Sequence, residues 1–281
     1  MKNQKIILGL VSTAYIALCA NVVVADAADN NRAVSDLNGT VEASAGTKNG
    51  DGNYNIGGNI DIPLGDKFGL QFDTMYNKAG SEDGGGLAAH YFYRNPESFL
   101  LGATAMWYDI EGYDIFRYGA ESEFYLDDFT LAPSAGFQTG AANDGVTGFY
   151  SLDASYYPEE NIKLTIGTQG YSNIIAGYAE AEWQPFNDTP MSFYINGGDV
   201  EDGNAFALVG VRFSFGVDGQ SLKYRNRHSD PVNIVRNLSI ANGGTLHKKA
   251  EEQNSNSTGG GYGYGYECPG SADFGHAAAA C

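Results

Sequence analysis

Acidic side chains alternate with apolar ones at every second position in several segments of this chain. In residues 116–124, for example, Arg117, Glu121 and Glu123 share one face, and the other face is apolar. Carried through residues 37–216, this alternation places twelve charged residues on one common face: Glu42, Asp61, Asp73, Arg94, Arg117, Glu121, Glu123, Asp153, Lys163, Glu180, Glu182 and Arg212. The acidic members outnumber the basic ones by four, so this face would attract cations.

Patterns for other chemistry are weak. The sequence holds no His and Cys constellation for a metal, no Gly-Lys-Ser loop for a phosphate, and no basic surface for a nucleic acid. A lipid-hydrolysing enzyme would need a Ser and a His close together on a lipid-facing surface. The only histidine in residues 37–216, His90, shares the charged face. We therefore expect no catalytic residues, metal or cofactor.

The N-terminus has the pattern of a secretory signal peptide. Lys2 and Lys5 precede an apolar stretch at residues 6–18, and Ala25-Asp26-Ala27 gives a small-residue cleavage site. A lipoprotein signal at Cys19 is the rival interpretation, but it needs a small residue where Leu18 stands. We expect residues 1–27 to be removed and residues 28–36 to form an N-terminal periplasmic segment.

After residue 28 no stretch of 18 apolar residues occurs, whereas period-two alternation recurs about every fifteen residues, the spacing of tilted membrane strands. The content of 38 Gly, 19 Tyr and 15 Phe also favours a turn-rich β protein. We predict an all-β antiparallel transmembrane β-barrel of about twelve strands, with ten or fourteen left open. The predicted strands span residues 37–47, 53–62, 68–77, 86–94, 99–109, 115–126, 129–139, 147–157, 162–170, 174–185, 191–198 and 204–215.

The connections between these strands fall into two alternating sets. One set, at residues 63–66, 95–98, 127–128, 158–161 and 186–190, carries Pro, Asp and Asn and is expected to face the periplasm. The other set is mostly Gly-rich and acidic, as outward loops would be, and none of it is long enough to fold deep into the lumen. The apolar faces carry Ala and Gly in mid-strand and aromatic residues at strand ends, which favours lipid contact over a water-soluble sandwich.

The last predicted strand ends in Gly210-Val211-Arg212-Phe213-Ser214-Phe215. With these residues, the chain resembles the bacterial outer-membrane β-barrel (porin-like) family over residues 37–216. The resemblance implies that Gly210, Phe213 and Phe215 form the signal read by the barrel-assembly machinery. Leu208 departs from that signal, where a polar residue is usual. The resemblance also implies a Gram-negative outer membrane, with its lipid and lipopolysaccharide as partners.

Residues 217–281 differ from the barrel in charge and composition. They hold 6 Lys and Arg against 6 Asp and Glu, whereas residues 37–216 hold 7 against 25. Their Asn, Ser, Gly and Tyr runs predict a flexible periplasmic tail. Its basic cluster of Lys223, Arg225, Arg227 and His228 is interpreted as a solvated linker, with binding to anionic headgroups as the alternative. Cys268 and Cys281 either form a disulfide in the oxidising periplasm or are incidental.

A barrel of twelve strands lies between those filled by their own side chains and those with a wide channel. We therefore predict a narrow, acidic, cation-preferring pore for small solutes, with charge pairs that seal the interior as the competing interpretation. A second hypothesis is a structural or surface-interaction barrel, in which Asp199, Glu201 and Asp202 hold divalent cations among lipopolysaccharide phosphates. The third hypothesis is a lipid-modifying enzyme.

Overall fold

The computed structural model describes residues 32–110, 112–140, 143–171, 174–186, 188–200, 205–217, 219–229 and 231–236. The predicted signal peptide, Cys268, Cys281 and the Gly/Tyr run lie outside these residues. The strands are β1 (Asn38–Lys48), β2 (Asp51–Leu64), β3 (Phe68–Ala79), β4 (Glu82–Asn95), β5 (Phe99–Ile110), β6 (Tyr113–Leu126), β7 (Phe129–Gly140), β8 (Asn143–Glu159), β9 (Ile162–Tyr171), β10 (Ile174–Trp183), β11 (Met191–Val200) and β12 (Phe206–Phe215).

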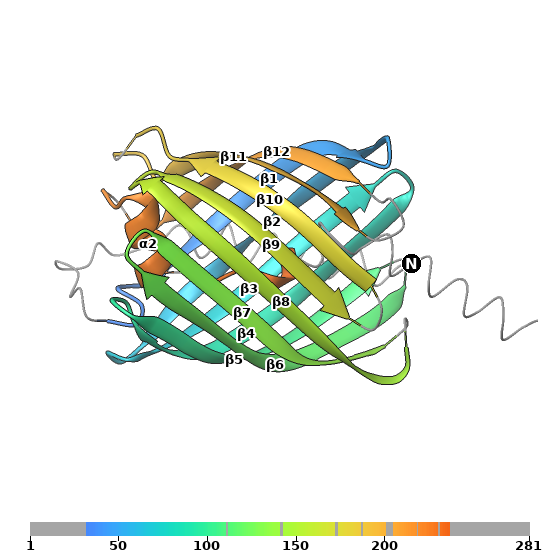
Figure 1. The fold of residues 1–281 in the computed structure, drawn as a ribbon, viewed down its shortest axis with the longest axis horizontal. Coiled ribbons are helices and arrows are strands. Elements are labelled where there is room, and N and C mark those ends of the chain that lie inside the picture. The colour runs from blue at the N-terminus through green and yellow to red at the C-terminus, as the bar shows by residue number, and fades with distance from the viewer. Residues whose placement is uncertain are drawn as a thin grey trace, which may run out of the picture.

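The strands form a closed antiparallel barrel (Figure 1), which confirms the predicted fold class and the count of twelve. Each strand pairs with the next one in sequence, and β1 pairs with β12, where Gly39 faces Phe215 and Glu42 faces Arg212. Because the sheet closes on itself, none of its strands is left with an unpaired edge, as a lipid environment requires.

The connections at both ends of the barrel are short. We call the end that holds the start of β1 and the end of β12 the α2 end, after the helix described below, and the other end the opposite end. At the opposite end, Asn49 and Gly50 join β1 to β2 with φ angles of 54° and 89°, a conformation that suits Asn and Gly. Residues expected in outward loops, such as Glu82, belong to the strand ladders instead.

The outer surface of the barrel is apolar. Exposed side chains include Ile56, Leu101, Ile166 and Val209, and aromatic pairs such as Phe68 with Tyr91 and Phe129 with Tyr156 stack near the α2 end. Another pair, Tyr118 with Phe137, lies in β6 and β7. This arrangement suits a lipid surface flanked by aromatic belts. Among the described helices, none is long and apolar enough to cross a bilayer.

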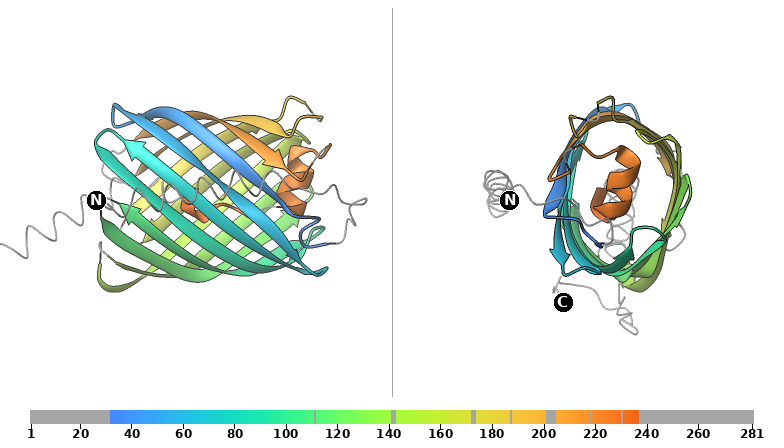
Figure 2. Two further views of the ribbon diagram at one scale, coloured as in Figure 1. Left: turned by 180° about the vertical axis from the view of Figure 1, so that it is seen from behind. Right: turned by 90° about the vertical axis from the view of Figure 1, so that its left-hand side faces the viewer.

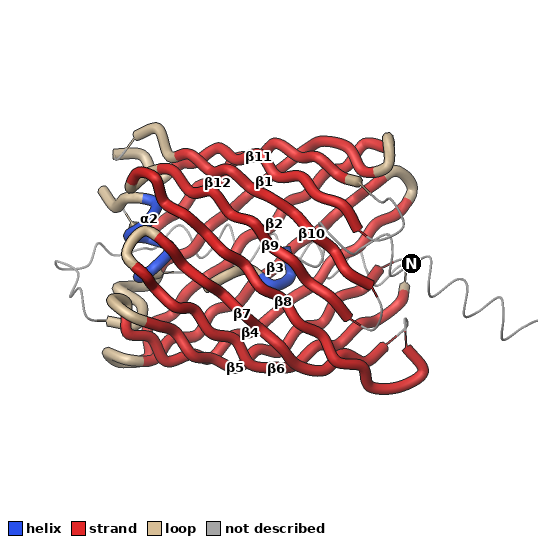
Figure 3. Tube along the Cα trace, viewed as in Figure 1, coloured by secondary structure: helices blue, strands red, loops and turns tan. Residues whose placement is uncertain are grey.

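The described residues between 217 and 236, called residues 217–236 below, do not begin a flexible tail, as predicted from the sequence, but fold into the barrel. The helix α2 (Leu222–His228) lies inside the mouth of the α2 end, and residues 231–236 continue into the interior (Figures 2 and 3). The physical reason is apolar burial, since Val217, Leu222 and Val235 are almost inaccessible. Ser221 caps α2 by accepting a hydrogen bond from the Tyr224 backbone N–H.

The N-terminal residues 32–36, predicted as a periplasmic segment, pack into the same mouth. Val34 belongs to a buried cluster with Phe92, Leu100 and Tyr125, and the Ser35 N–H donates to the His228 carbonyl oxygen. Both ends of the described chain therefore help to fill one end of the barrel.

Ile166, exposed at the middle of β9, tests whether this surface meets lipid. Ile166→Arg should lower the free energy of unfolding from lipid vesicles by about 2–4 kcal/mol, because a charge at the bilayer midplane loses its hydration. The control Val146→Arg, on the same outer surface but near a strand end, should cost about 0–1 kcal/mol. Denaturant titration checks both, and equal effects would contradict a membrane-spanning surface.

Candidate pore lining

All twelve charged residues predicted to share a face point into the barrel. Lys163 is partly exposed, and the other residues are buried by neighbouring interior side chains and by residues 217–236. Their common orientation follows from the two-residue period of the strands, because the two register shifts, at residues 138–140 of β7 and 156–159 of β8, lie near strand ends and outside the paired positions of these residues. That these side chains line a conducting pore stays a prediction.

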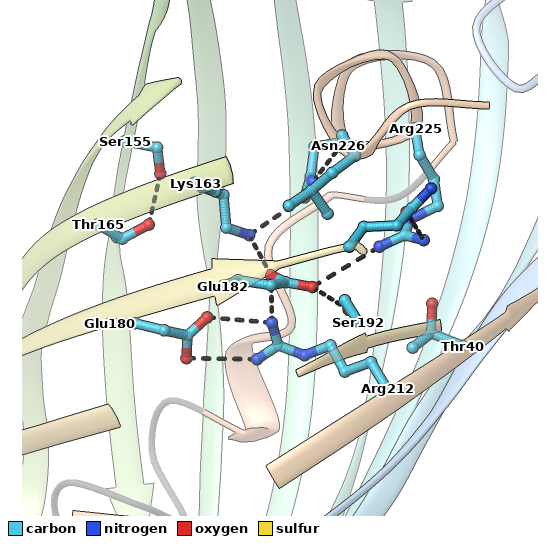
Figure 4. A network of polar contacts seen from close by, with 12 residues as sticks. Thr40, Ser155, Lys163, Thr165, Glu180, Glu182, Ser192, Arg212, Arg225 and Asn226 are labelled. Atoms are coloured by element: carbon cyan, nitrogen blue, oxygen red, sulfur yellow. Dashed lines mark hydrogen bonds and ion pairs between the residues drawn. The ribbon is translucent and has the colours of Figure 1, made fainter. Parts of the chain in front are cut away.

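The largest charge cluster is centred on Arg212 of β12 (Figure 4). Its Nε donates to Glu42 Oε2 of β1, which the figure does not label, at 2.8 Å. Its Nη1 donates to Glu180 Oε1 of β10 at 3.0 Å. The same Nη1 contacts Glu182, and the Arg212 guanidinium lies 4.0 Å from the centre of the Tyr194 ring. One guanidinium therefore holds three interior carboxylates in fixed positions.

Helix α2 adds further charge to this cluster. Glu182 is contacted by Lys163 Nζ of β9 at 3.1 Å and by Arg225 Nη2 of α2 at 3.6 Å (Figure 4). Arg225 also donates to Gln184 Oε1 at 3.1 Å, and Lys163 donates to Asn226 Oδ1 at 3.3 Å. The helix is thus bound to the wall through buried polar contacts.

The basic cluster of α2 is not a solvated linker, which corrects our interpretation of the sequence. Lys223 Nζ lies 2.8 Å from Asp128 Oδ1 and 3.4 Å from Glu160 Oε1, on two turns of the α2 end. Arg227 donates to the carbonyl oxygens of Asp127 and Phe129 at 2.7 and 2.9 Å. These residues dock the helix on an acidic rim, which the linear sequence did not show because the turns lie far away in the chain.

A second interior cluster surrounds His90, to which we had assigned no role beyond its inward phase. His90 Nε2 lies 3.0 Å from Asp73 Oδ2, and Nδ1 lies 2.8 Å from Glu121 Oε2. The imidazole can donate to both carboxylates only with two ring protons, and it then adds a positive charge. The Ile234 N–H also donates to Asp73, so residues 231–236 engage this cluster as well.

The other predicted lining residues occupy separate positions. Glu123 Oε2 accepts from the Tyr125 hydroxyl at 2.8 Å, and Glu123 Oε1 accepts from the Val232 N–H at 3.3 Å. Asp153 accepts from the Tyr178 hydroxyl, and Asp61 is buried in β2. The twelve residues therefore do not form one ring.

The two remaining arginines lie over aromatic rings. Arg117 donates to Gln138 Oε1 at 2.6 Å and lies 4.9 Å from the centre of the Phe149 ring. Arg94 donates to the Ala33 carbonyl oxygen at 2.9 Å and lies 4.9 Å from the centre of the Phe92 ring. Both guanidinium groups thus gain cation–π contacts inside the barrel.

An apolar cluster fills the interior toward the opposite end, and we had not predicted it. Val235 is buried there against side chains from several strands, namely Met75, Ala88, Met106, Tyr108, Ile110, Ile115, Phe149, Tyr171, Ala176, Phe206 and Leu208. The signal was present in β5, where Met106, Tyr108 and Ile110 share the inward phase. Between this cluster and α2 lies a polar cavity of about 100 Å³.

The residues of the predicted assembly signal lie in β12. Phe213 is exposed on the outer surface, and Phe215 pairs with Gly39 at the α2 end. A Cβ at position 210 would lie 2.4 Å from the Tyr194 ring, so Gly210 leaves room for that ring. Recognition of these residues by assembly machinery stays a prediction.

Comparison with known proteins identifies relatives by fold only. No protein-family model and no curated protein sequence matches the chain. Among solved structures, the KdgM porin in complex with disordered oligogalacturonate is similar with a TM-score of 0.52 and 14% identity, covering 63% of this chain and 99% of that one. Another KdgM porin structure gives 0.52 and 13%, with the same coverage. A third, from a study of in-meso crystallisation of membrane proteins, gives 0.51 and 13%, covering 70% and 98%.

Arg212→Gln tests the central cluster. Removing this guanidinium leaves buried carboxylates with fewer counter-charges, which should cost about 3–5 kcal/mol of stability. The protein is heated to a series of temperatures and run on a denaturing gel. The temperature at which the band shifts from the mobility of the folded barrel to that of the unfolded chain should therefore fall markedly. The control Arg32→Gln, which removes the surface pair with Asp66, should leave it nearly unchanged. An unchanged temperature for Arg212→Gln would contradict the stabilising role.

His228 makes the docking of α2 depend on pH. Burial lowers the pKa of His228 below its ordinary 6.5, although a hydrogen bond to the Tyr224 carbonyl oxygen opposes this shift. The charges of Arg94 and Arg227 lower the pKa further, and Glu97 raises it. The docked helix therefore takes up the His228 proton less readily than the released helix, so docking should weaken as pH falls below 6.5 and should not change above it.

A nitroxide at position 226, in a chain whose native cysteines are replaced by Ser, measures this docking. Its EPR spectrum should gain a mobile component as the pH falls from about 6.5 to about 5.5. His228→Gln should reduce that gain, and an equal gain in the variant would assign the effect to other groups.

Proposed function

We propose that this chain, which has the fold of bacterial outer-membrane β-barrels, is a porin-like channel for small cationic solutes, closed here by residues 217–236. The observation that carries the proposal is the occupation of an acidic interior by a basic segment of the same chain. In this proposal the barrel is exported to the outer membrane, and the α2 end faces the periplasm.

The charge distribution supports a preference for cations. The twelve interior wall residues carry a surplus of four carboxylates, which becomes three when His90 holds two ring protons, and residues 217–236 bring Arg225 and Arg236 to that wall. When the segment leaves, these two counter-charges leave with it. The field of the surplus carboxylates, focused by the apolar wall, would then raise the local concentration of cations.

The packing supports closure by the segment. The polar cavity of about 100 Å³ holds a few water molecules at about 30 Å³ each, and it is far below the roughly 300 Å³ of a small ligand pocket. Val235 and the apolar cluster fill the interior beside it. Solute passage therefore requires residues 231–236 to move.

The ligand named for the structural neighbour is not proposed for this chain. KdgM is described in complex with oligogalacturonate, which is a polyanion. An interior with surplus carboxylates disfavours a polyanion and favours solutes of opposite charge.

A structural barrel without transport is the second candidate. It is favoured by the paired charges around Arg212 and by the apolar cluster, which together leave little free volume. The two candidates differ in what happens when residues 217–236 are absent. The β1–β12 ladder ends at Phe215, so the wall is complete without them.

Deletion of residues 217–281 should leave a folded barrel with a large, cation-selective conductance in planar bilayers. The full mature chain should conduct weakly or open rarely. Deletion of residues 237–281 alone is the matched control and should behave as the full chain, because it keeps the described segment in the lumen. The reversal potential under a salt gradient gives the selectivity, which should fall as the Debye length shrinks from about 10 Å at 0.1 M to about 3 Å at 1 M salt.

A folded deletion variant without conductance would favour the structural barrel. An anion-selective reversal potential would contradict the acidic pore.

A further inference from the structure

We propose that the lumen contains a binding site for guanidinium-bearing solutes, formed by Glu42, Glu180 and Tyr194, and that Arg236 fills it in the closed barrel. This inference rests on the proposed function only in that a solute must be able to reach the lumen. The site lies where the strands β1, β10 and β11 face the end of the described segment.

Arg236 supplies the geometry of the bound group. Its Nε lies 3.3 Å from Glu42 Oε1, its Nη2 contacts Glu180 Oε2, and its Cζ lies 5.1 Å from the centre of the Tyr194 ring. Two carboxylates from different strands and one aromatic ring thus surround a single guanidinium. None of these three wall residues belongs to the segment that carries Arg236.

The wall holds this site in place without Arg236. Arg212 binds the other oxygen of Glu42 at 2.8 Å and contacts Glu180 at 3.0 Å, so both carboxylates are fixed by a residue of β12. Asn196 of β11 also donates to Glu180 Oε2 at 2.9 Å. A site whose ligands are held by other groups binds with less loss of side-chain entropy.

Without the segment, one carboxylate oxygen of Glu42 would lack its counter-charge. Its side chain is 4% exposed, and its Oε1 accepts no hydrogen bond from the described residues. The charged group facing this oxygen is the Arg236 guanidinium. Withdrawal of residues 231–236 would leave a buried, oriented carboxylate oxygen at the polar cavity, which Glu42, Glu180 and Arg236 line together.

The chemistry of the site selects a guanidinium among cations. A guanidinium is planar, offers several N–H donors to carboxylates, and stacks on an aromatic face, whereas a quaternary ammonium offers no N–H donor. Anions meet two carboxylates and are disfavoured. A guanidinium solute and Arg236 would compete for the same oxygens, so the solute would favour the withdrawn segment.

The test uses the full mature chain with Arg236→Ala, which empties the site, and agmatine, whose guanidinium on a butyl stem matches an arginine side chain. Isothermal titration calorimetry in detergent should show that agmatine binds to the Arg236→Ala variant. Agmatine should bind more weakly to the wild type, because there Arg236 competes for the same carboxylates. Adding Glu42→Gln to Arg236→Ala should weaken binding about tenfold or more, because a charge-assisted hydrogen bond is lost.

Three controls make the result specific. Glu97→Gln, in an exposed turn outside the lumen, should leave agmatine binding to Arg236→Ala unchanged. Butyltrimethylammonium, with the same charge and no N–H donor, should bind at least about tenfold more weakly than agmatine. Arg236→Gln serves as a second starting variant that keeps most of the side-chain volume, and its agmatine binding should also depend on Glu42.

Absence of agmatine binding in both folded starting variants would overturn the site, and so would binding that Glu42→Gln leaves unchanged. Equal binding of butyltrimethylammonium would reduce the site to general charge attraction and would overturn it too. Calorimetry needs no conduction, so binding in a barrel that never conducts would retain the site and remove the proposed function. Conduction without agmatine binding would retain the proposed function and remove the site.

Discussion

Pairing of β1 with β12 is the constraint on which the rest of the molecule depends. In a lipid environment an unpaired strand edge leaves backbone N–H and C=O groups without water, so the sheet must close. Closure at the register of Gly39 with Phe215, together with the other antiparallel ladders, turns alternate residues of the strands toward the inside. It also brings Glu42 beside Arg212, although the two residues lie near opposite ends of the barrel sequence. The central charge cluster is therefore a product of closure and not of any local motif.

Closure also sets the volume that has to be filled. Eight strands enclose a space that side chains can fill, whereas twelve enclose more. Here the chain itself fills the excess, with α2 at one end and Val235 among apolar side chains toward the other. The loops predicted at the opposite end could not fill this space, because most of the residues assigned to them belong to strand ladders and the connections that remain are short. The segment after β12 can, because β12 ends at the α2 mouth, beside the lumen that the segment enters.

The strand count and the inward phase of the charged residues could be predicted from the sequence, because a two-residue period is a local property that closure preserves. Residues 217–236 could not be placed, because averaging over residues 217–281 hid Val232, Ile234 and Val235 among polar runs. The partners of Lys223 and Arg227 lie on turns 63 to 100 residues away, so no local pattern reveals them. His90 was placed inside, but its two carboxylate neighbours come from β3 and β6 and appear only in the folded barrel.

The chemistry of the segment bears on whether it can leave. A purely apolar plug would gain free energy in proportion to its buried area and would stay in place. Residues 217–236 gain free energy from apolar burial mainly at Val217, Leu222 and Val235. Arg225 and Arg236 lose hydration when they enter the lumen, and their ion pairs with carboxylates offset much of that cost. Because the two effects of a buried ion pair nearly cancel, the charged part of the interface fixes position more than it adds stability. In the proposed channel, a segment held in this way would be displaced by a modest free energy, such as that of His228 protonation or of the binding of a competing cation.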